Sequence, residues 1–100
     1  TIYPDEIEPY YSSPLFAAHC VVPARGPDGN DLPTLVVEPA NEAMSDSEIQ
    51  RVFGALRAAA PPRLRAASVV RCRERFPRTA LGKIKRRELA ESLCRAGVLA

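Results

Sequence analysis

The clearest structural signal in this chain is a helix near its middle, whose position limits the folds that the chain can adopt. Ser45-Asp46-Ser47-Glu48 has the form of a capping box, in which the serine and glutamate side chains satisfy backbone donors of the first turn. Apolar residues continue at helical spacing as far as the Pro61-Pro62 pair: Ile49, Val52, Phe53, Leu56 and Ala60. A long amphipathic helix needs a second layer to cover its apolar face.

Three segments with strand-like patterns surround this helix and supply that second layer. Leu15 to Val22 comes first. Its side chains should alternate between two faces, Phe16, Ala18, Cys20 and Val22 on one and Ala17, His19 and Val21 on the other. Residues 25–31 are rich in turn formers, so a hairpin is expected between this strand and Leu32 to Glu38. Ser68 to Arg73 is predicted as the third strand.

A short helix is predicted at the start of the chain. Pro4 and the acidic residues after it suit a helix N-terminus. Ile7, Tyr10 and Tyr11 then fall on one face. Pro9 removes a backbone donor inside this pattern, so the helix should be short or distorted.

A last helix is expected from about Lys85 to Ala96, with Leu89 and Leu93 turned inward and Gly97 as its C-cap. The element order is therefore αββαβα. It predicts an α+β fold, in which a small sheet with a hairpin is flanked by about three helices, and residues 1–100 are expected to form a single domain.

The cysteine and histidine residues form no recognisable metal or nucleophile motif. Cys20, Cys72 and Cys94 lie far apart, no Cys-x-x-Cys pair occurs, and His19 is the only histidine. No metal site is therefore predicted. The cysteines are expected to be reduced and largely buried, and His19 is expected to be a half-exposed strand residue rather than a catalytic base.

The net charge of +2 conceals a strong asymmetry between the two halves of the chain. Residues 1–50 carry one basic and nine acidic residues, whereas residues 51–100 carry thirteen basic and three acidic ones. The basic half could attract nucleic acid, a phosphate-bearing small molecule or an acidic protein, or could pair with the acidic half. Only Phe76 falls among the basic residues, so the interleaved aromatic side chains of a specific nucleic-acid binder are missing.

The segment most suggestive of chemistry spans residues 76–89. It contains Gly82-Lys83, but a P-loop would require glycine in place of Pro77 and serine or threonine in place of Ile84. What remains is a loop that proline stiffens and Gly82 lets bend, with Lys83 just before a helix. Lys83 can therefore offer a mobile positive charge to an anion such as a phosphate. The alternative interpretation is that Lys83 is an ordinary solvated lysine on the surface.

Two motifs in the chain carry a family resemblance. Pro77-Arg78-Thr79, Gly82-Lys83, Arg86 and Leu89 form one, and the opening stretch from Ile2 to Glu8 forms the other. They resemble the last motif of the adenylate-forming ligases and the start of the C-terminal lid domain of those enzymes. This superfamily contains acyl- and aryl-CoA synthetases, peptide-synthetase adenylation domains and firefly luciferase. The order and spacing of the two motifs fit a whole lid, so the resemblance covers essentially the entire chain.

The resemblance implies that Lys83 is the catalytic lysine of acyl-adenylate formation, that Thr79 and Gly82 shape its loop, and that Arg86 braces the loop. The lid would then rotate and withdraw Lys83 while a thiol attacks the adenylate. A large N-terminal domain, absent from this chain, would bind the carboxylic acid and most of the ATP and Mg²⁺. The chain alone is therefore expected to be inactive.

Within the superfamily, the Pro-Arg-Thr, Gly-Lys-Ile and Arg-Arg pattern looks most like the acyl-CoA synthetase branch. This implies a fatty acid, long-chain by first choice, as substrate and coenzyme A as acceptor. A fatty acyl-AMP ligase, or an adenylation domain that loads an acyl-carrier protein, is the second interpretation. A basic nucleic-acid-binding module and a non-catalytic docking module remain as alternatives of another class. The chain shows no signal peptide and no apolar run long enough to span a bilayer. A cytoplasmic enzyme is expected, because its cysteines are predicted to be reduced.

Overall fold

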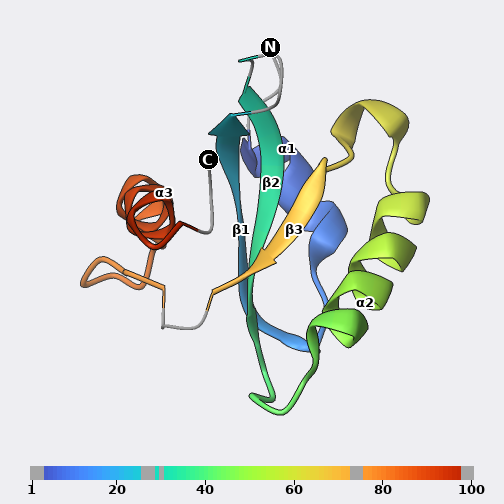
Figure 1. The fold of residues 1–100 in the computed structure, drawn as a ribbon, viewed down its shortest axis with the longest axis horizontal. Coiled ribbons are helices and arrows are strands. Elements are labelled where there is room, and N and C mark those ends of the chain that lie inside the picture. The colour runs from blue at the N-terminus through green and yellow to red at the C-terminus, as the bar shows by residue number, and fades with distance from the viewer. Residues whose placement is uncertain (1–3, 26–28, 30, 73–75, 98–100) are drawn as a thin grey trace.

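A computed structural model describes residues 4–25, 29, 31–72 and 76–97 of the chain (Figure 1). The predicted α+β class and the order αββαβα are confirmed. The elements are α1 (Pro4–Ile7), the 3₁₀ turn η1 (Glu8–Tyr11), β1 (Phe16–Arg25), β2 (Asp31–Pro39), α2 (Asp46–Ala59), the 3₁₀ turn η2 (Pro62–Leu64), β3 (Ser68–Arg71) and α3 (Arg86–Arg95).

The described strands form one mixed sheet in the order β1-β2-β3. β1 and β2 pair antiparallel as the predicted hairpin, and Cys20 lies opposite Val36. β2 and β3 pair parallel, with Leu35 opposite Val69, because α2 carries the chain across between them. The central strand β2 is buried on both sides, which requires a helical layer on each face of the sheet.

Helices cover the two faces of the sheet unequally (Figure 1). We call the face covered by α1, η1 and α2 the α2 face; its buried residues are Ile7, Tyr11, Phe16, Val21, Leu35, Val37, Met44, Ile49, Phe53, Leu64, Ala66 and Val69. We call the opposite face the α3 face; its buried residues are Ala18, Cys20, Val22, Val36, Cys72, Phe76, Leu89 and Leu93. The sheet is therefore the middle layer between two separate clusters of apolar side chains.

Phe16 lies on the other face of the sheet from the one predicted. It was expected beside Ala18, but it packs in the α2-face cluster with Val21. The pairing shifts between these positions, since Phe16 lies opposite Pro39 while Ala18 lies opposite Glu38. A β-bulge at this point adds one residue to β1 and reverses the alternation before it.

The first helical segment divides at Pro9 as expected, but Tyr10 does not face the core. α1 ends at Ile7 and a 3₁₀ turn follows, so Ile7 and Tyr11 point inward while Tyr10 is 42% exposed. The buried Tyr11 ring stacks on Phe53, with 5.6 Å between ring centroids. Its hydroxyl accepts a hydrogen bond of 2.7 Å from the backbone N–H of Ala66, so the first segment is tied to the chain beyond α2.

The capping box of α2 forms as predicted. Ser45 is the N-cap, and its hydroxyl accepts a hydrogen bond of 3.2 Å from the N–H of Glu48. The helix ends before the Pro61-Pro62 pair, as expected. Both signals are local, which explains why the sequence alone located this helix well.

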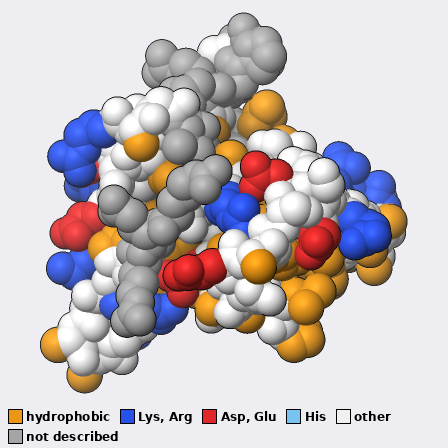
Figure 2. Space-filling view, turned by 60° about the horizontal axis from the view of Figure 1, so that its bottom comes forward, with side chains coloured by type: hydrophobic (Ala, Val, Ile, Leu, Met, Phe, Trp, Pro, Cys, Tyr) orange, Lys and Arg blue, Asp and Glu red, His pale blue; other side chains and the backbone are white. Residues whose placement is uncertain are grey.

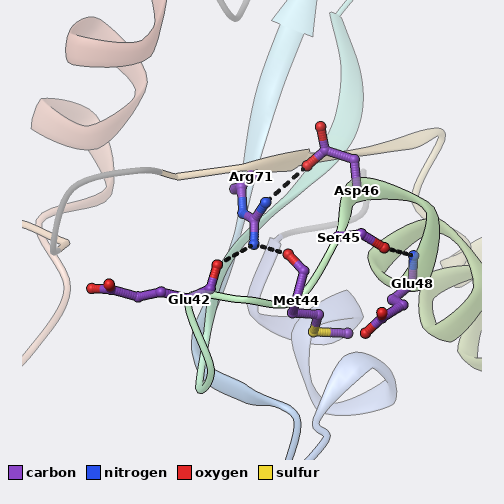
Figure 3. A network of polar contacts seen from close by, with 6 residues as sticks. All are labelled: Glu42, Met44, Ser45, Asp46, Glu48 and Arg71. Carbon is purple, nitrogen blue, oxygen red and sulfur yellow. Dashed lines mark hydrogen bonds and ion pairs between the residues drawn. The ribbon is translucent and has the colours of Figure 1, made fainter.

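Arg71 at the end of β3 fastens the loop that leads into α2 (Figure 3). Its Nη1 atom lies 3.1 Å from Oδ1 of Asp46, and Nη2 donates to the carbonyl groups of Met44 and Glu42. The arginine side chain is only 16% exposed. It therefore serves as an interior clamp between β3 and the start of α2 rather than as part of a basic binding surface.

Element bounds elsewhere differ modestly from the prediction. β1 and β2 extend further into the hairpin, and α3 spans residues 86–95 instead of 85–96. Gly97 follows α3 with a φ of +77°, as its predicted capping role requires. β3 ends at Arg71, and the predicted strand residue Arg73 lies outside the described residues, as do parts of the predicted hairpin turn and of the opening motif.

The cysteines are thiols, as predicted, but only two of them are buried. Cys20 and Cys72 belong to the α3-face cluster, whereas Cys94 is exposed. Successive residues of a helix point about 100° apart, so Cys94 turns outward while its neighbour Leu93 faces the sheet. His19 is half-buried on β1 as predicted, with Nε2 2.9 Å from the carbonyl oxygen of Glu8.

Candidate functional site

The predicted site lies on a loop whose two ends are both attached to the α3 face. Phe76 is buried at the start of the loop, and its N–H donates to Oε1 of Glu38 at 3.2 Å. The two arms approach each other at an antiparallel bridge between Arg78 and Ile84, and Ile84 packs against the α3-face cluster. The loop extends outward below α3 in Figure 1.

Thr79 and Gly82 close the tip of this loop. The N–H of Gly82 donates to the carbonyl of Thr79 at 2.9 Å, and the N–H of Thr79 donates to the carbonyl of Lys83 at 2.8 Å. The hydroxyl oxygen of Thr79 also accepts the N–H of Lys83 at 3.2 Å. Gly82 has a φ of +87°, a left-handed conformation that other residues rarely adopt. The structure thus brings Thr79, Gly82 and Lys83 together in one tight turn.

Lys83 stands apart from the other basic residues near the start of α3. Lys85 pairs with Glu88 at 3.7 Å, Arg87 pairs with Glu91 at 3.5 Å, and Arg86 pairs with Glu8. In the described part of the chain the ammonium group of Lys83 has no ion-pair or hydrogen-bond partner, and the residue is exposed. Its charge is therefore available to an anion that approaches the loop.

Arg78 supports the turn from the other arm. Its Nη1 atom donates to the carbonyl of Gly82 at 3.0 Å, directly before Lys83. The turn is therefore held by backbone bonds, by the Thr79 hydroxyl and by a guanidinium group, while the Lys83 side chain stays out of all these contacts.

Arg86 lies apart from the tip and is half-buried at the first residue of α3. Its Nη2 atom contacts Oε1 of Glu8, an oxygen that also accepts the N–H of Val21 at 2.9 Å. Burial lowers the pKa of Arg86, but the Glu8 hydrogen bond and the nearby Cys20 and Glu8 groups outweigh it and raise that pKa above its usual value. Arg86 is therefore fully charged and tied to the protein rather than free to bind a ligand.

Cys20 beneath this pair is not a nucleophile at neutral pH. Burial raises the pKa of its thiol to about 11, the negative charge of Glu8 adds to that effect, and Arg86 opposes it. The thiol is thus protonated in the physiological range.

Glu8 is the residue near the site whose contact the sequence did not reveal. It belongs to the opening motif, but it lies 78 positions before Arg86. No periodicity or local spacing connects two residues so far apart. Their opposite charges, one in each half of the chain, were the only signal.

The charge asymmetry of the sequence is partly resolved by pairing in the fold. The Arg86–Glu8 and Arg71–Asp46 ion pairs each join the basic half to the acidic half. On the face shown in Figure 2, basic and acidic side chains lie interspersed, and the basic ones form separate groups. This arrangement favours internal complementarity over a continuous basic surface for nucleic acid.

Two general properties of the described residues bear on the site. They contain no group of three His, Cys, Asp or Glu side chains placed to hold a metal ion. None of their helices is both long and apolar enough to cross a membrane.

Known proteins match this chain in structure, whereas the searches by sequence find no match. The sequence matches no protein-family model and no curated protein. An anthranilate CoA ligase in complex with anthranoyl-AMP matches 98% of the chain with a TM-score of 0.76 and 21% identity. The chain has the fold of a segment of acyl- and aryl-CoA synthetases.

Two further solved structures agree. The Mycobacterium tuberculosis fatty acyl CoA synthetase matches 94% of the chain with a TM-score of 0.69 and 22% identity. ATP-bound MatB from Rhodopseudomonas palustris matches 92% of it with a TM-score of 0.67 and 20% identity. The chain spans only 18% of each of these two proteins and 19% of the anthranilate CoA ligase. Its fold is therefore that of a small part of much larger enzymes.

Proposed function

We propose that this chain is the C-terminal lid of an ATP-dependent acid–thiol ligase, and that Lys83 is its catalytic residue. The observation that carries the proposal is the loop from Phe76 to Lys85, which is anchored at both ends and presents at its tip a lysine without a partner among the described residues. A solvated surface lysine needs no such support. The shared fold with acyl- and aryl-CoA synthetases supplies the enzyme class in which this loop has a use.

Lys83 would act in the first half-reaction, in which a carboxylate attacks the α-phosphate of ATP and pyrophosphate leaves. Both reactants are anionic, so their approach is electrostatically unfavourable. An ammonium group between them offsets this repulsion and fixes their line of approach. A residue held by the Thr79–Gly82 turn is suited to this task, because its backbone is fixed while its side chain is exposed to solvent.

The second half-reaction would use the same lid in another orientation. A thiol attacks the acyl-adenylate, forms the thioester and releases AMP. Lys83 is no longer needed at this step, so rotation of the lid can withdraw it and admit the thiol.

The remaining components of the reaction would be bound mainly outside this chain. By the family resemblance, Mg²⁺ and most contacts to ATP are assigned to a large N-terminal domain. That domain would also hold the acid. A fatty acid with coenzyme A as acceptor is our first choice, by resemblance of the two motifs, and an acyl-carrier protein is the second. We place the enzyme in the cytoplasm, where cysteines remain thiols, as they are here.

Lys83→Ala in the full-length enzyme tests the proposal, with Lys85→Ala as the matched control. Removing Lys83 should slow acid-dependent ATP–pyrophosphate exchange by roughly 10²–10³-fold, the effect of losing one preorganised electrostatic contact. Thioester formation from supplied acyl-adenylate should change far less. Lys85 is two residues away but already paired with Glu88, so its removal should leave both half-reactions nearly unchanged.

Two results would contradict this assignment. Equal losses in both half-reactions for Lys83→Ala would mean that the residue is structural. ATP–pyrophosphate exchange by the isolated chain would mean that no large domain is required.

A further inference from the structure

Glu8 joins three elements that are distant in sequence. It lies at the start of η1, and its Oε1 atom accepts the N–H of Val21 in β1 at 2.9 Å and the Nη2 group of Arg86 in α3. Its own carbonyl oxygen lies 2.9 Å from Nε2 of His19, also in β1. Glu8 is therefore fixed to β1 through both its main chain and its side chain. Its contact with Arg86 links α3 to this fixed point.

Arg86 depends on this carboxylate for its orientation. The Nε atom of Arg86 is buried and makes no hydrogen bond within the described residues. Nη2 makes the ion pair with Glu8, and the neutral thiol of Cys20 is the other polar group close to the guanidinium group. Glu8 is also largely enclosed, with its side chain 21% exposed. The Arg86 side chain itself is 40% exposed, so the pair is enclosed on the Glu8 side, where the carboxylate is also held by the N–H of Val21. A charge-assisted contact to a carboxylate fixed in this way holds its geometry more firmly than a pair between two solvated side chains.

The other ion pairs at the start of α3 cannot perform the same task. Lys85–Glu88 and Arg87–Glu91 are spaced three and four residues apart along the helix, and both glutamates are 60% exposed. They stabilise the helix itself. In the described structure, Arg86–Glu8 is the one ion pair that ties α3 to another element.

The position of α3 in turn determines where the Lys83 loop lies. The N–H of Lys85 donates to the carbonyl of Pro77 at 2.7 Å, and the N–H of Arg86 donates to the carbonyl of Ile84 at 3.1 Å. The backbone from Lys83 to Arg86 is therefore held by hydrogen bonds, and Arg86 is the residue that Glu8 contacts. A shift of Arg86 would be transmitted to Lys83 over three residues of bonded backbone.

We propose that Glu8 is a positioning residue for Lys83, acting through Arg86 to hold the lysine loop at the distance from the sheet that adenylation requires. This inference rests on the proposed function, because it assumes that Lys83 acts in adenylation. It assigns a role to the opening segment of the chain that is distinct from that of a linker.

The test compares Glu8→Gln with the control Glu88→Gln in the full-length enzyme. Glutamine keeps an oxygen for the N–H of Val21 but removes the charge that holds Arg86. Glu8→Gln should lower kcat for acid-dependent ATP–pyrophosphate exchange by about 10- to 100-fold, the range expected when a reacting group is misplaced by about 1 Å. The KM for ATP and the thioester half-reaction should change less than threefold. The control should match wild type in all of these measurements.

A double-variant cycle separates positioning from a general structural role. If Glu8 acts through the lysine, Glu8→Gln should cause no further loss of exchange in a Lys83→Ala background. A loss that persists without Lys83, or a Glu8→Gln enzyme that resembles the Glu88→Gln control, would overturn the inference. Absence of acid-dependent exchange in the wild-type enzyme would instead overturn the proposed function itself.

Arg86→Lys provides a second variant if Glu8→Gln lowers the melting temperature too far for assay. Lysine keeps the positive charge but loses the planar fork that meets the carboxylate. It should slow adenylation less than Glu8→Gln does, and again only in the presence of Lys83. An unchanged rate in Arg86→Lys, together with a normal melting temperature, would contradict the proposed path from Glu8 to Lys83.

Discussion

The two faces of the sheet differ in how they use their polar groups. On the α2 face, Arg71 is fully engaged with the loop before α2, and the Tyr11 hydroxyl meets a backbone donor inside the core. On the α3 face, an equally well-supported loop ends in Lys83, whose ammonium group meets nothing in the described structure. On the α2 face these two polar groups are satisfied within the protein, whereas the supported loop on the α3 face leaves the Lys83 charge available within the described structure.

This difference separates the residues that stabilise the fold from those that perform the proposed chemistry. The α2 face contains the larger apolar cluster and is covered by the longest helix. The α3 face has a smaller cluster, and the tip of the loop beside it is fixed by hydrogen bonds rather than by burial. Substitutions on the α2 face should therefore change stability most, and substitutions in the Lys83 loop should change activity with little change in stability.

The largest stability effect is expected for Phe53→Ala on the α2 face. Phe53 is buried and stacks on Tyr11, so its removal leaves a cavity in the larger cluster. The free energy of unfolding should fall by about 3–5 kcal/mol, measured by urea titration. Gln50→Ala, at an exposed position of the same helix, should change it by less than about 0.5 kcal/mol. Similar losses in both variants would mean that this cluster does not dominate stability.

Local signals were enough to predict much of the fold. The α2 helix, the hairpin and the inward positions of α3 follow from capping residues, alternation and helical spacing, all of which act over a few residues. The predicted orientations of Phe16 and Tyr10 were wrong, because a β-bulge and a 3₁₀ turn change the periodicity of the chain there. Neither feature has a specific residue pattern. Predictions from periodicity fail where the backbone departs from a regular helix or strand.

The candidate site was predictable only in part, for the same reason. Thr79, Gly82 and Lys83 lie within five residues, so the motif that suggested them also brings them together in space. Glu8 was missed as the partner of Arg86 because their contact depends on how η1, β1 and α3 meet. Tertiary packing of that kind leaves no local pattern in the sequence.

The next largest effect is expected in the reactivity of the cysteines. Raising the pKa of Cys20 from 9.0 to about 11 lowers its thiolate fraction at neutral pH by about 100-fold, and burial hinders access further. Cys94 is exposed on α3. Iodoacetamide at pH 8 should therefore modify Cys94 at least about 100-fold faster than Cys20, as followed by peptide mass spectrometry. Equal rates would show that the α3-face cluster opens readily.

The same pKa shift predicts a pH dependence of stability. Folding favours the protonated thiol of Cys20, so its contribution to stability is complete below pH 9 and is lost as the pH rises towards 11. In Cys20→Ala this alkaline loss should be smaller than in wild type when unfolding is measured between pH 8 and pH 11. An unchanged alkaline profile would assign that loss to other groups.

A smaller effect is expected for Gly82→Ala in the loop. No heavy atom lies within 4 Å of an added Cβ, so the cost arises from the left-handed backbone alone, at about 1–2 kcal/mol. The exposed turn should relax to avoid this strain, which would displace Lys83 and slow adenylation more than it lowers the melting temperature. Gly54→Ala is the matched control, since Gly54 also has open space around it but lies in α2. It should stabilise the protein by about 0.5–1 kcal/mol.

The smallest effect is expected for Thr79→Val, which removes the hydroxyl that accepts the N–H of Lys83 while keeping the shape of the side chain. The residue is exposed, so water can replace the lost acceptor and the free energy of unfolding should change by no more than about 0.5 kcal/mol. Adenylation should slow only a few-fold, because the backbone bonds between Thr79 and Lys83 remain. Thr79→Ser keeps the acceptor and should match wild type in both measurements. If Thr79→Val destabilised the protein as strongly as Phe53→Ala, the loop would be part of the structural core, and the division of roles between the α2 face and the Lys83 loop would be wrong.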